Sequence, residues 1–390
     1  MSEVTSKFPQ LRFPEFSGEW KNRRLDEIFY EIKDKVGNQN IETFSISAGK
    51  GFISQRKKFG RDISGQQNKK YIVVHPNQFS YNKGNSKTFK YGCVYPNNTN
   101  SIIAVPNVFI SFKLKDSEMS VLFFAKIFEN HHLDRGLRRI ISSSARMDGL
   151  LNVNKKYFFE LTVPVTTKPE QQKIAAFLTA VDNKIEQLSK KKELLGEYKK
   201  GLMQQIFSQA IRFKADDGSD FPDWKEKKLG SLCEITTGKL DANAMVKDGQ
   251  YRFYTCAKEY YKIDDYAFDT DALIVSGNGA NVGYIHHYQG KFNAYQRTYV
   301  LDSFTDNIVF VKFVLDGYLH KRIMKEKNEG NTPYIVMGTL TDMKINLPSF
   351  SEQTKISNFL SSIDNKIEQV GKQLDESKQF KKALLQQMFV

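Results

Sequence analysis

Basic and amide side chains gather in a few loops of this chain, and their chemistry suits nucleic acid. Arginine pairs with guanine, and asparagine or glutamine pairs with adenine, through two hydrogen bonds in the major groove; lysine and arginine also hold phosphates. The candidates in the first half of the chain are Tyr81, Lys83, Asn85, Ser86, Lys87, Arg138, Arg139 and Arg146. Those in the second half are Asn278, Asn281, Gln296, Arg297, Lys325 and Lys327. Each one alone also fits a solvated surface position, so the predicted DNA contact rests on the clusters.

The charge of the chain favours the same partner. The 390 residues carry a net charge of +14, with an isoelectric point near 9.3. Such an excess of lysine and arginine is typical of proteins that bind a polyanion, most often nucleic acid. A membrane is the weaker alternative, because no apolar run approaches the ~18–20 residues of a spanning helix and residues 1–10 lack the apolar core of a secretory signal. We therefore expect a cytoplasmic protein.

The three cysteines, Cys93, Cys233 and Cys256, are isolated in the sequence and form no C-x-x-C pair. This pattern fits a reducing compartment and argues against a disulfide scaffold. The histidine pairs at 131–132 and 286–287 do not resemble metal ligands, because adjacent residues face different ways on a strand or a helix. Zinc-protease, serine-hydrolase and Walker motifs are all missing from the sequence. We expect a chain without catalytic residues, metal or cofactor of its own.

One enzymatic alternative stays open at this point. Residues 277–283 form a G-x-G-x-x-x-G segment after an apolar strand, and Asn331-Thr332-Pro333-Tyr334 is one residue away from the N-P-P-Y motif of amino-methyltransferases. Together they allow a self-contained DNA adenine-N6 methyltransferase. However, residues 284–288 predict another strand, whereas a phosphate-binding loop needs a helix at that place. A glycine-rich turn is therefore the favoured interpretation.

A long helical segment is present twice in the chain. These two segments are the elements that must position the candidate loops. Residues 170–207 reappear as residues 352–389, an offset of 182 at both ends with no insertion or deletion. Apolar residues recur at steps of four and three, which predicts a coiled coil. The seam residues are Ile174, Leu178, Val181, Ile185 and Leu188 in the first copy and Ile356, Leu360, Ile363, Ile367 and Val370 in the second. About 40 residues at 1.5 Å each make a rod of about 60 Å; periodicity alone allows parallel or antiparallel pairing.

Polar residues mark both the beginnings and the seams of these helices. Thr167 with Glu170, and Ser349 with Glu352, have the S/T-x-x-E spacing of capping boxes. Lysines also occupy seam positions, at Lys192, Lys199 and Lys381, so we expect looser packing there.

Before the first helix and between the two helices lie segments rich in Tyr, Phe, Val and Ile with Gly and Asn turns, which predict mixed sheet domains. The sequence thus predicts an α+β protein with two mixed α/β domains separated by two long helices. We expect domains at 1–166 and 211–347 and coiled-coil helices at 167–210 and 348–390.

Two repeated motifs and one further segment carry a resemblance to a known family. They are Glu170-Gln171-Gln172-Lys173-Ile174 with Glu352-Gln353-Thr354-Lys355-Ile356, Asp-Asn-Lys-Ile-Glu-Gln at 182–187 and 364–369, and the Asp223-Trp224-Lys225 approach to the second domain. In this arrangement the chain resembles the specificity subunit of type I restriction–modification systems. The resemblance implies two target-recognition domains that each read one half of a bipartite, asymmetric DNA target. It also implies an antiparallel coiled-coil spacer.

The resemblance further implies partners that supply the chemistry. Two methyltransferase (modification) subunits would dock on the spacer and methylate adenines with S-adenosylmethionine. Restriction subunits would add ATP- and Mg-dependent translocation and cleavage. The chain itself would then be a non-catalytic specificity subunit.

Overall fold

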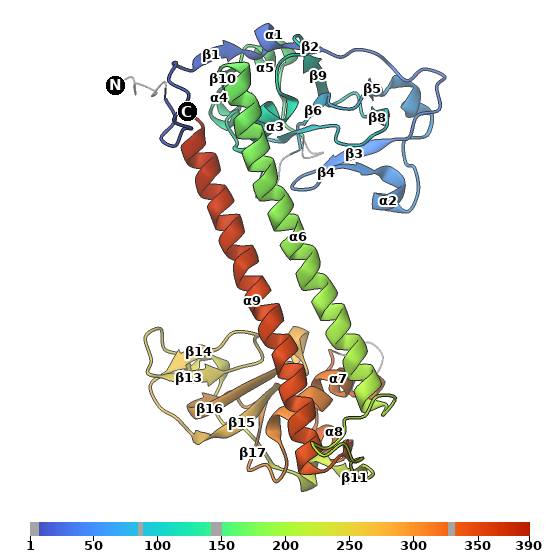
Figure 1. Ribbon diagram of the computed structural model, residues 1–390, viewed down its shortest axis with the longest axis vertical. Coiled ribbons are helices and arrows are strands. Elements are labelled where there is room, and N and C mark those ends of the chain that lie inside the picture. Colours follow the sequence, from blue (N-terminus) through green and yellow to red (C-terminus); the bar gives the residue numbers. More distant parts are fainter. Residues whose placement is uncertain (1–7, 85–88, 142–149, 327–331) are drawn as a thin grey trace. The chain divides into compact units, whose positions relative to one another are not determined.

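The computed structural model describes residues 8–84, 89–141, 150–326 and 332–390. Its contacts divide the chain into two compact units (Figure 1). Unit 1 comprises Met1–Leu188 and Gln373–Val390, and unit 2 comprises Ser189–Lys372. Each unit is a mixed α/β domain together with one part of each long helix, α6 (Lys168–Phe207) and α9 (Phe350–Met388). Neither these nor the other described helices are long and apolar enough to cross a membrane.

In unit 1, the described strands form one four-stranded sheet and three strand pairs. The sheet has the order β2-β9-β6-β7, and the pairs are β1-β10, β3-β4 and β5-β8. The strands are β1 (Lys21–Arg24), β2 (Phe29–Glu31), β3 (Phe44–Ser47), β4 (Gly51–Ser54), β5 (Ile72–Val74), β6 (Phe79–Asn82), β7 (Cys93–Pro96), β8 (Ile103–Val105), β9 (Ile110–Leu114) and β10 (Thr162–Val165). The helices are α1 (Leu25–Ile28), α2 (Gln55–Phe59), η1 (Gly65–Lys70), α3 (Val121–Glu129), α4 (Asp134–Ile140) and α5 (Lys155–Phe159).

The core of unit 1 is unusually aromatic. Phe29, Phe79, Phe112 and Phe124 are fully buried, and the Phe79 and Phe112 rings stack with centroids 5.5 Å apart. The same core includes Ile174 and Leu178 of α6 and Leu384, Leu385 and Met388 of α9. Burial of this apolar surface therefore ties the sheet and both helix segments into one unit.

In unit 2, the described strands form a six-stranded sheet with the order β12-β17-β15-β16-β13-β14 and the pair β11-β18. The strands are β11 (Lys225–Lys228), β12 (Glu234–Thr237), β13 (Tyr251–Tyr254), β14 (Tyr261–Ile263), β15 (Phe268–Ser276), β16 (Ile285–Ala294), β17 (Thr298–Asp302) and β18 (Lys344–Leu347). The helices are η2 (Leu229–Ser231), η3 (Ala242–Ala244), η4 (Gly279–Asn281), α7 (Ile308–Glu326) and α8 (Met337–Thr341). One sheet face packs on α7 and the long helices through Leu273 and Val275, while Ala272 and Ile274 point to the other face.

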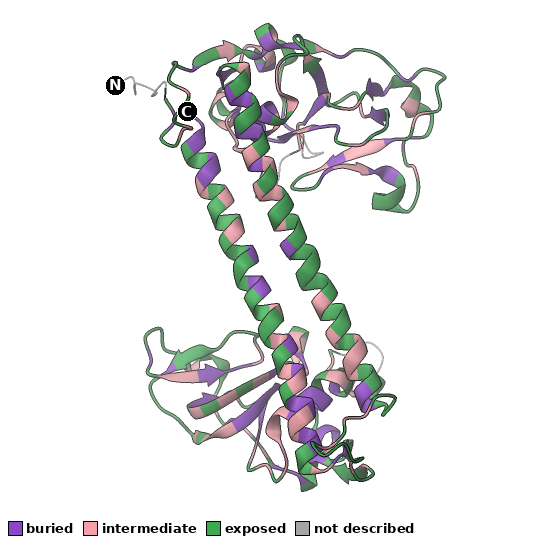
Figure 2. Cartoon of the chain, viewed as in Figure 1, coloured by how far each residue is buried: buried purple, intermediate pink, exposed green. Residues whose placement is uncertain are grey.

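The long helices pair in opposite directions. In unit 1 the first turns of α6 pack beside the last turns of α9. In unit 2 the last turns of α6, at Ile206 and Phe207, share a core with Ile356, Leu360 and Ile363 at the start of α9. The predicted antiparallel coiled coil is therefore confirmed. Figure 2 shows buried and half-buried patches interrupted by exposed ones on both long helices. At the predicted seam positions, Leu188 and Val370 are buried, and Val181, Ile185 and Ile367 are half-buried.

A buried glutamate anchors the first turn of α6. Arg12 donates two hydrogen bonds of 2.7 and 2.8 Å to the Glu170 carboxylate, and Trp20 Nε1 donates a third at 3.4 Å. Thr166 Oγ1 donates to the same carboxylate. The glutamate side chain is only 1% exposed. Such a charge is tolerated in the interior because it is paired and fully hydrogen-bonded.

The first turn of α9 repeats this arrangement. Glu352, which is 0% exposed, accepts hydrogen bonds from Arg212 at 2.8 Å and from Trp224 Nε1 at 3.1 Å. The Ser349 hydroxyl accepts from the Glu352 backbone N–H at 3.4 Å, so half of the predicted capping box is present. The capping-box interpretation of both glutamates is nevertheless wrong, because their carboxylates bind the arginine and tryptophan of the domain. We call these two clusters the helix roots.

The glutamine that follows each root glutamate joins the helix to its domain. Gln171 Nε2 donates to Thr166 O at 2.8 Å while its Oε1 accepts from the Ser120 N–H that begins α3. Gln353 does the same between Pro348 O and the Asn307 N–H before α7. The repeated Glu-Gln pair is therefore a structural joint.

Two of the seam lysines form ion pairs that are equivalent in the repeat. Lys199 of α6 binds both oxygens of Asp364 at 2.6 and 2.7 Å within unit 2. In unit 1, Lys381 of α9 binds Asp182 at 2.5 Å and also pairs with Glu129. Lys199 and Lys381, like the two aspartates, are 182 residues apart. Polar seam residues of this kind set register at some expense of stability.

The Lys381 ion pairs predict a pH dependence of unit 1. Burial lowers the pKa of Lys381, but hydrogen bonds to Asp182 and Glu129 outweigh it and leave the pKa above its ordinary 10.5. A raised lysine pKa stabilises the fold fully below pH 10.5, and this stabilisation is lost as the pH rises through the folded-state value. Above pH 10.5, we therefore expect the stability of unit 1 to fall less steeply with pH in Lys381→Met than in the wild-type protein. Melting temperatures of the two proteins across the alkaline range test this, and parallel curves would contradict it.

Candidate nucleic-acid interface

Unit 2 has a polar hollow of about 280 Å³ where three segments meet. Gly277 follows β15, and its N–H donates to Arg297 O, just before β17, at 2.9 Å. The Ile335 N–H then donates to Gly277 O at 2.7 Å, which brings Tyr334 alongside Asn278. Glycine is required here, because a Cβ at position 277 would lie 2.3 Å from Arg297 O. The hollow is therefore shaped by backbone hydrogen bonds.

Four of its side chains could read DNA. The hollow is lined by Asn278, Gln296, Arg297 and Tyr334, together with Gly277, Tyr299 and Ile335. Gln296 and Arg297 are exposed, and Tyr334 is 55% exposed, so its ring is available for stacking. Gln296 Nε2 donates to Asp241 at 2.7 Å, which fixes the amide and leaves its oxygen free to accept. Burial raises the pKa of Tyr299, whose hydroxyl donates to Ile335 O at 2.9 Å. Tyr299 thus supports the floor.

The hollow brings together three sequence candidates, Asn278, Gln296 and Arg297, and adds Tyr334. Asn281 lies one turn away, where its amide donates to Cys256 O at 3.1 Å and fixes the neighbouring loop. Lys325 is exposed near the end of α7 and does not line the hollow. Lys327 lies outside the described residues.

In unit 1 one candidate is corrected by the structure. Tyr81 is 0% exposed, its ring stacks on Phe158 at 4.9 Å, and its hydroxyl donates to Tyr91 O at 2.7 Å. Burial raises the pKa of this tyrosine well above its ordinary value. The prediction that Tyr81 contacts DNA is wrong, since its ring fills the core under β6.

The remaining unit 1 candidates are dispersed. Lys83 is half-buried and donates to Val153 O at 3.1 Å. Arg138 and Arg139 are exposed in the last turn of α4, where a cation also suits the helix dipole. Asn85, Ser86, Lys87 and Arg146 lie outside the described residues.

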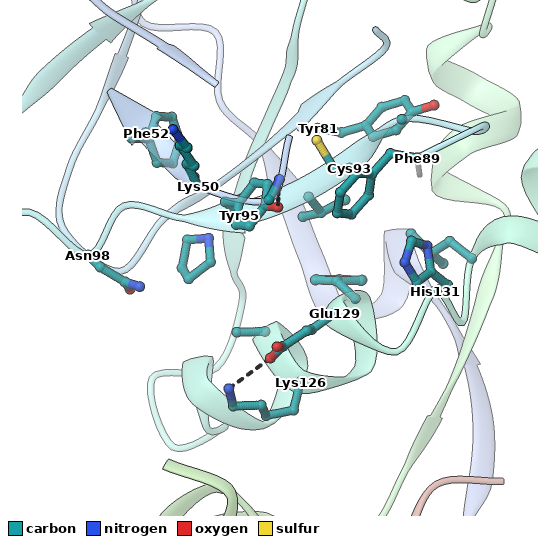
Figure 3. A pocket seen from close by; sticks show the side chains of 18 of the residues that line it. Lys50, Phe52, Tyr81, Phe89, Cys93, Tyr95, Asn98, Lys126, Glu129 and His131 are labelled. Carbon is teal, nitrogen blue, oxygen red and sulfur yellow. Dashed lines mark hydrogen bonds and ion pairs between the residues drawn. The ribbon is translucent and has the colours of Figure 1, made fainter. Parts of the chain in front are cut away.

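Unit 1 also contains a larger cavity, of about 570 Å³ (Figure 3). Figure 3 shows Phe52, Phe89 and Tyr95 around it, with Lys126 and Glu129 on the α3 side. Its buried cation is already paired, because Lys126 binds Glu129 at 2.8 Å and also Asp182. Burial raises the pKa of the Cys93 thiol at its wall to about 11, so this cysteine is not a nucleophile near neutral pH. The cavity offers little to a phosphate.

The glycine segment forms the turn that the sequence favoured. Residues 277–284 connect β15 directly to β16, its antiparallel neighbour, through the short turn η4. No helix follows at the place where a phosphate loop would need one within this described segment. The histidines are engaged locally: His286 binds Ala257 O at 3.0 Å, and His287 binds Asp271 at 2.8 Å. Asn331 of the N-T-P-Y motif lies outside the described residues.

Comparisons with known proteins agree with this architecture. Residues 222–377 match the family model described as "Type I restriction modification DNA specificity domain". The type I restriction enzyme EcoDI specificity subunit of Escherichia coli is 43% identical over 168 residues, which covers 42% of this chain and only 37% of that protein. The putative type I restriction enzyme MjaX specificity subunit of Methanocaldococcus jannaschii is 22% identical over 97% of this chain and 94% of that protein.

A solved structure supports the fold along the whole chain. The type I restriction–modification system S subunit from M. genitalium superposes with a TM-score of 0.66 at 19% identity, covering 98% of this chain and 99% of that one. Sequence and fold therefore agree: residues 222–377 match the type I restriction modification DNA specificity domain, and the chain has the fold of this S subunit along its length.

Proposed function

We propose that this chain selects the DNA target of a type I restriction–modification complex by reading a bipartite, asymmetric site. Each unit reads one half of the site, and unit 2 does so through its hollow. The observation that carries this proposal is the convergence of Asn278, Gln296, Arg297 and Tyr334 in that hollow. Amide and guanidinium groups on a rigid floor are the groups that distinguish base edges in the major groove.

The catalytic chemistry in this proposal belongs to partners. Two adenine methyltransferase subunits dock along the antiparallel helices and supply S-adenosylmethionine. Restriction subunits supply the ATP- and Mg-dependent steps in the cytoplasm. Among the described residues, no group of three or more His, Cys, Asp or Glu side chains could hold a metal ion. The helix pair supports two similar docking faces, because a similar sequence is presented twice in antiparallel directions.

Methylome sequencing of a host that expresses this chain with its methyltransferase partner tests the proposal. We expect one bipartite motif with a methylated adenine in each half. A single continuous motif, or no motif that depends on this chain, would refute it. Calorimetry of the purified chain with S-adenosylmethionine tests the alternative of a self-contained methyltransferase. That alternative predicts tight binding of the cofactor, whereas a specificity subunit should show no binding.

The helix length gives a second, quantitative test of the same proposal. Four residues inserted after Lys190, an exposed position of α6, are close to one turn and keep the apolar stripe on its face. They add about 6 Å of rod, so we expect the gap between the methylated half-sites to lengthen by about one or two base pairs. As a control, the same four residues inserted after Asp217, in the exposed turn beyond α6, should leave the gap unchanged. An unchanged gap in the helix insertion would refute the spacer role.

A further inference from the structure

Unit 2 carries a second basic site that no sequence motif marks. The Arg252 guanidinium lies between two tyrosine rings, 4.3 Å from the Tyr260 centroid and 4.2 Å from the Tyr288 centroid. Its Nη1 donates to Tyr254 Oη at 3.3 Å. We call Arg252 with these three tyrosines the arginine cage. Its members come from β13, β16 and the loop before β14, so the fold alone brings them together.

The cage holds the arginine rigid before any ligand arrives. A free arginine side chain loses considerable rotamer freedom when it binds, whereas stacking on two rings has already fixed this one. Tyr254 is itself buried and packs 4.8 Å from the His286 ring, so the cage rests on the sheet. The arrangement therefore presents a fixed guanidinium whose remaining donors are the N–H of Nε, the two of Nη2 and the second of Nη1.

The charge of the cage is not neutralised locally. Among the described residues, no carboxylate lies within ion-pair distance of Arg252, in contrast to Arg12 and Arg212 at the helix roots. Lys262 adds positive charge at the cage, with its ammonium 6.0 Å from the Tyr260 ring, and Lys258 in the same loop lies 6.0 Å from the Tyr284 ring outside the cage. The exposed carboxylate of Glu259 lies in the same loop. The cations outnumber it, which favours an anionic ligand.

The cage and the hollow are joined by one short loop. The Cys256 carbonyl accepts from Asn281 beside the hollow, and the Cys256 thiol contacts Arg297 O at 3.3 Å. Four residues later the same loop supplies Tyr260 to the cage. A duplex that places its bases over the hollow would therefore bring its backbone to the neighbouring cage.

We propose that Arg252 is a phosphate contact that positions the DNA backbone while the hollow reads the bases. This inference rests on the proposed DNA-reading function of unit 2. A phosphate suits the cage because the guanidinium is held in place and, among the described residues, no carboxylate pairs with it. Its free N–H groups can donate to phosphate oxygens, whereas a guanine contact through the same edge would appear as a loss confined to the cognate duplex.

Salt-dependent DNA binding by the full chain, purified with its methyltransferase partner, tests this assignment. Arg252→Gln should weaken binding of cognate and non-cognate duplexes by the same factor, about tenfold, and reduce the slope of log Kd against log salt by about 1. Arg252→Lys keeps the charge and should restore the slope. Lys225→Gln removes an equal charge from an exposed position on β11 and should change neither quantity.

A second variant separates binding from damage to the fold. Tyr260→Leu removes one wall of the cage at a position that is 41% exposed, so it should fold normally. We expect this variant to keep the wild-type slope of log Kd against log salt but to bind DNA more weakly, because the Arg252 charge remains while its guanidinium is no longer fixed by the ring. An unchanged slope in Arg252→Gln, or a loss confined to the cognate duplex, would overturn the phosphate assignment. Salt-independent binding by the wild-type complex would instead refute the proposed function itself.

Discussion

Replacement of Arg12 by alanine is expected to destabilise unit 1 by about 3–5 kcal/mol, the usual effect of removing one partner from a buried ion pair. The Glu170 carboxylate would stay in the interior with only Trp20 and Thr166 as donors. Arg12 is itself only 13% exposed, so little solvent reaches the pair to compensate. The sheet pair β1-β10 and the first turn of α6 should loosen together, because both depend on this root.

The duplication supplies a matched comparison. Arg212 is 26% exposed and also donates to two backbone carbonyls, so Arg212→Ala should destabilise unit 2 by a similar but somewhat smaller amount. The chain has two tryptophans, one at each root. Fluorescence of Trp20 in a Trp224→Phe background therefore follows unit 1 during denaturation, and the reverse pair follows unit 2.

A double substitution isolates the buried charge as the cause. Arg12→Met with Glu170→Met removes both charges and keeps the volume, and it should be more stable than Arg12→Ala alone. If Arg12→Ala loses less than about 1 kcal/mol, comparable to an exposed pair, the root is not an anchor.

The long helices could be predicted because their pattern is local. Heptad spacing and the position of proline gave helices within 167–210 and 348–390, and the structure has Lys168–Phe207 and Phe350–Met388. The roles of Glu170 and Glu352 could not be predicted from spacing, since their partners lie about 150 residues away in the chain. One signal was available: Leu11-Arg12-Phe13 is echoed by Ile211-Arg212-Phe213. In both copies this motif precedes the tryptophan, so it supplies the arginine that joins that tryptophan at the root glutamate.

The candidate site was predictable only in part, for a similar reason. Asn278 and Arg297 flank glycine-rich or short turns, and turn residues reach the surface at sheet edges. Tyr81 was mistaken for a loop residue, although it lies two residues after Phe79 on β6 and therefore shares its buried face. The arginine cage could not be predicted from the sequence, because Arg252, Tyr260 and Tyr288 are far apart in the chain and come into contact only when the sheet forms.

Arg297→Ala is expected to reduce affinity for the cognate duplex about five- to 150-fold, which corresponds to the roughly 1–3 kcal/mol of one good base contact. Arg297 is exposed, its backbone is fixed to Gly277, and it lies beside Asn278 and Tyr334. Because the Arg297 side chain is exposed, its removal should leave the fold unaffected. The complex should also methylate targets substituted at one base pair of one half-site, and no longer discriminate there.

This signature is the opposite of the one expected for Arg252, and that opposition makes both assignments testable with one set of duplexes. Binding of non-cognate DNA should be almost unchanged in Arg297→Ala, because a base contact contributes nothing where the base is wrong. Arg297→Lys should resemble alanine in specificity, since a point charge cannot form the paired hydrogen bonds of the guanidinium. Equal losses on cognate and non-cognate duplexes would make Arg297 a phosphate contact. Base discrimination in unit 2 would then fall to the amides of Asn278 and Gln296.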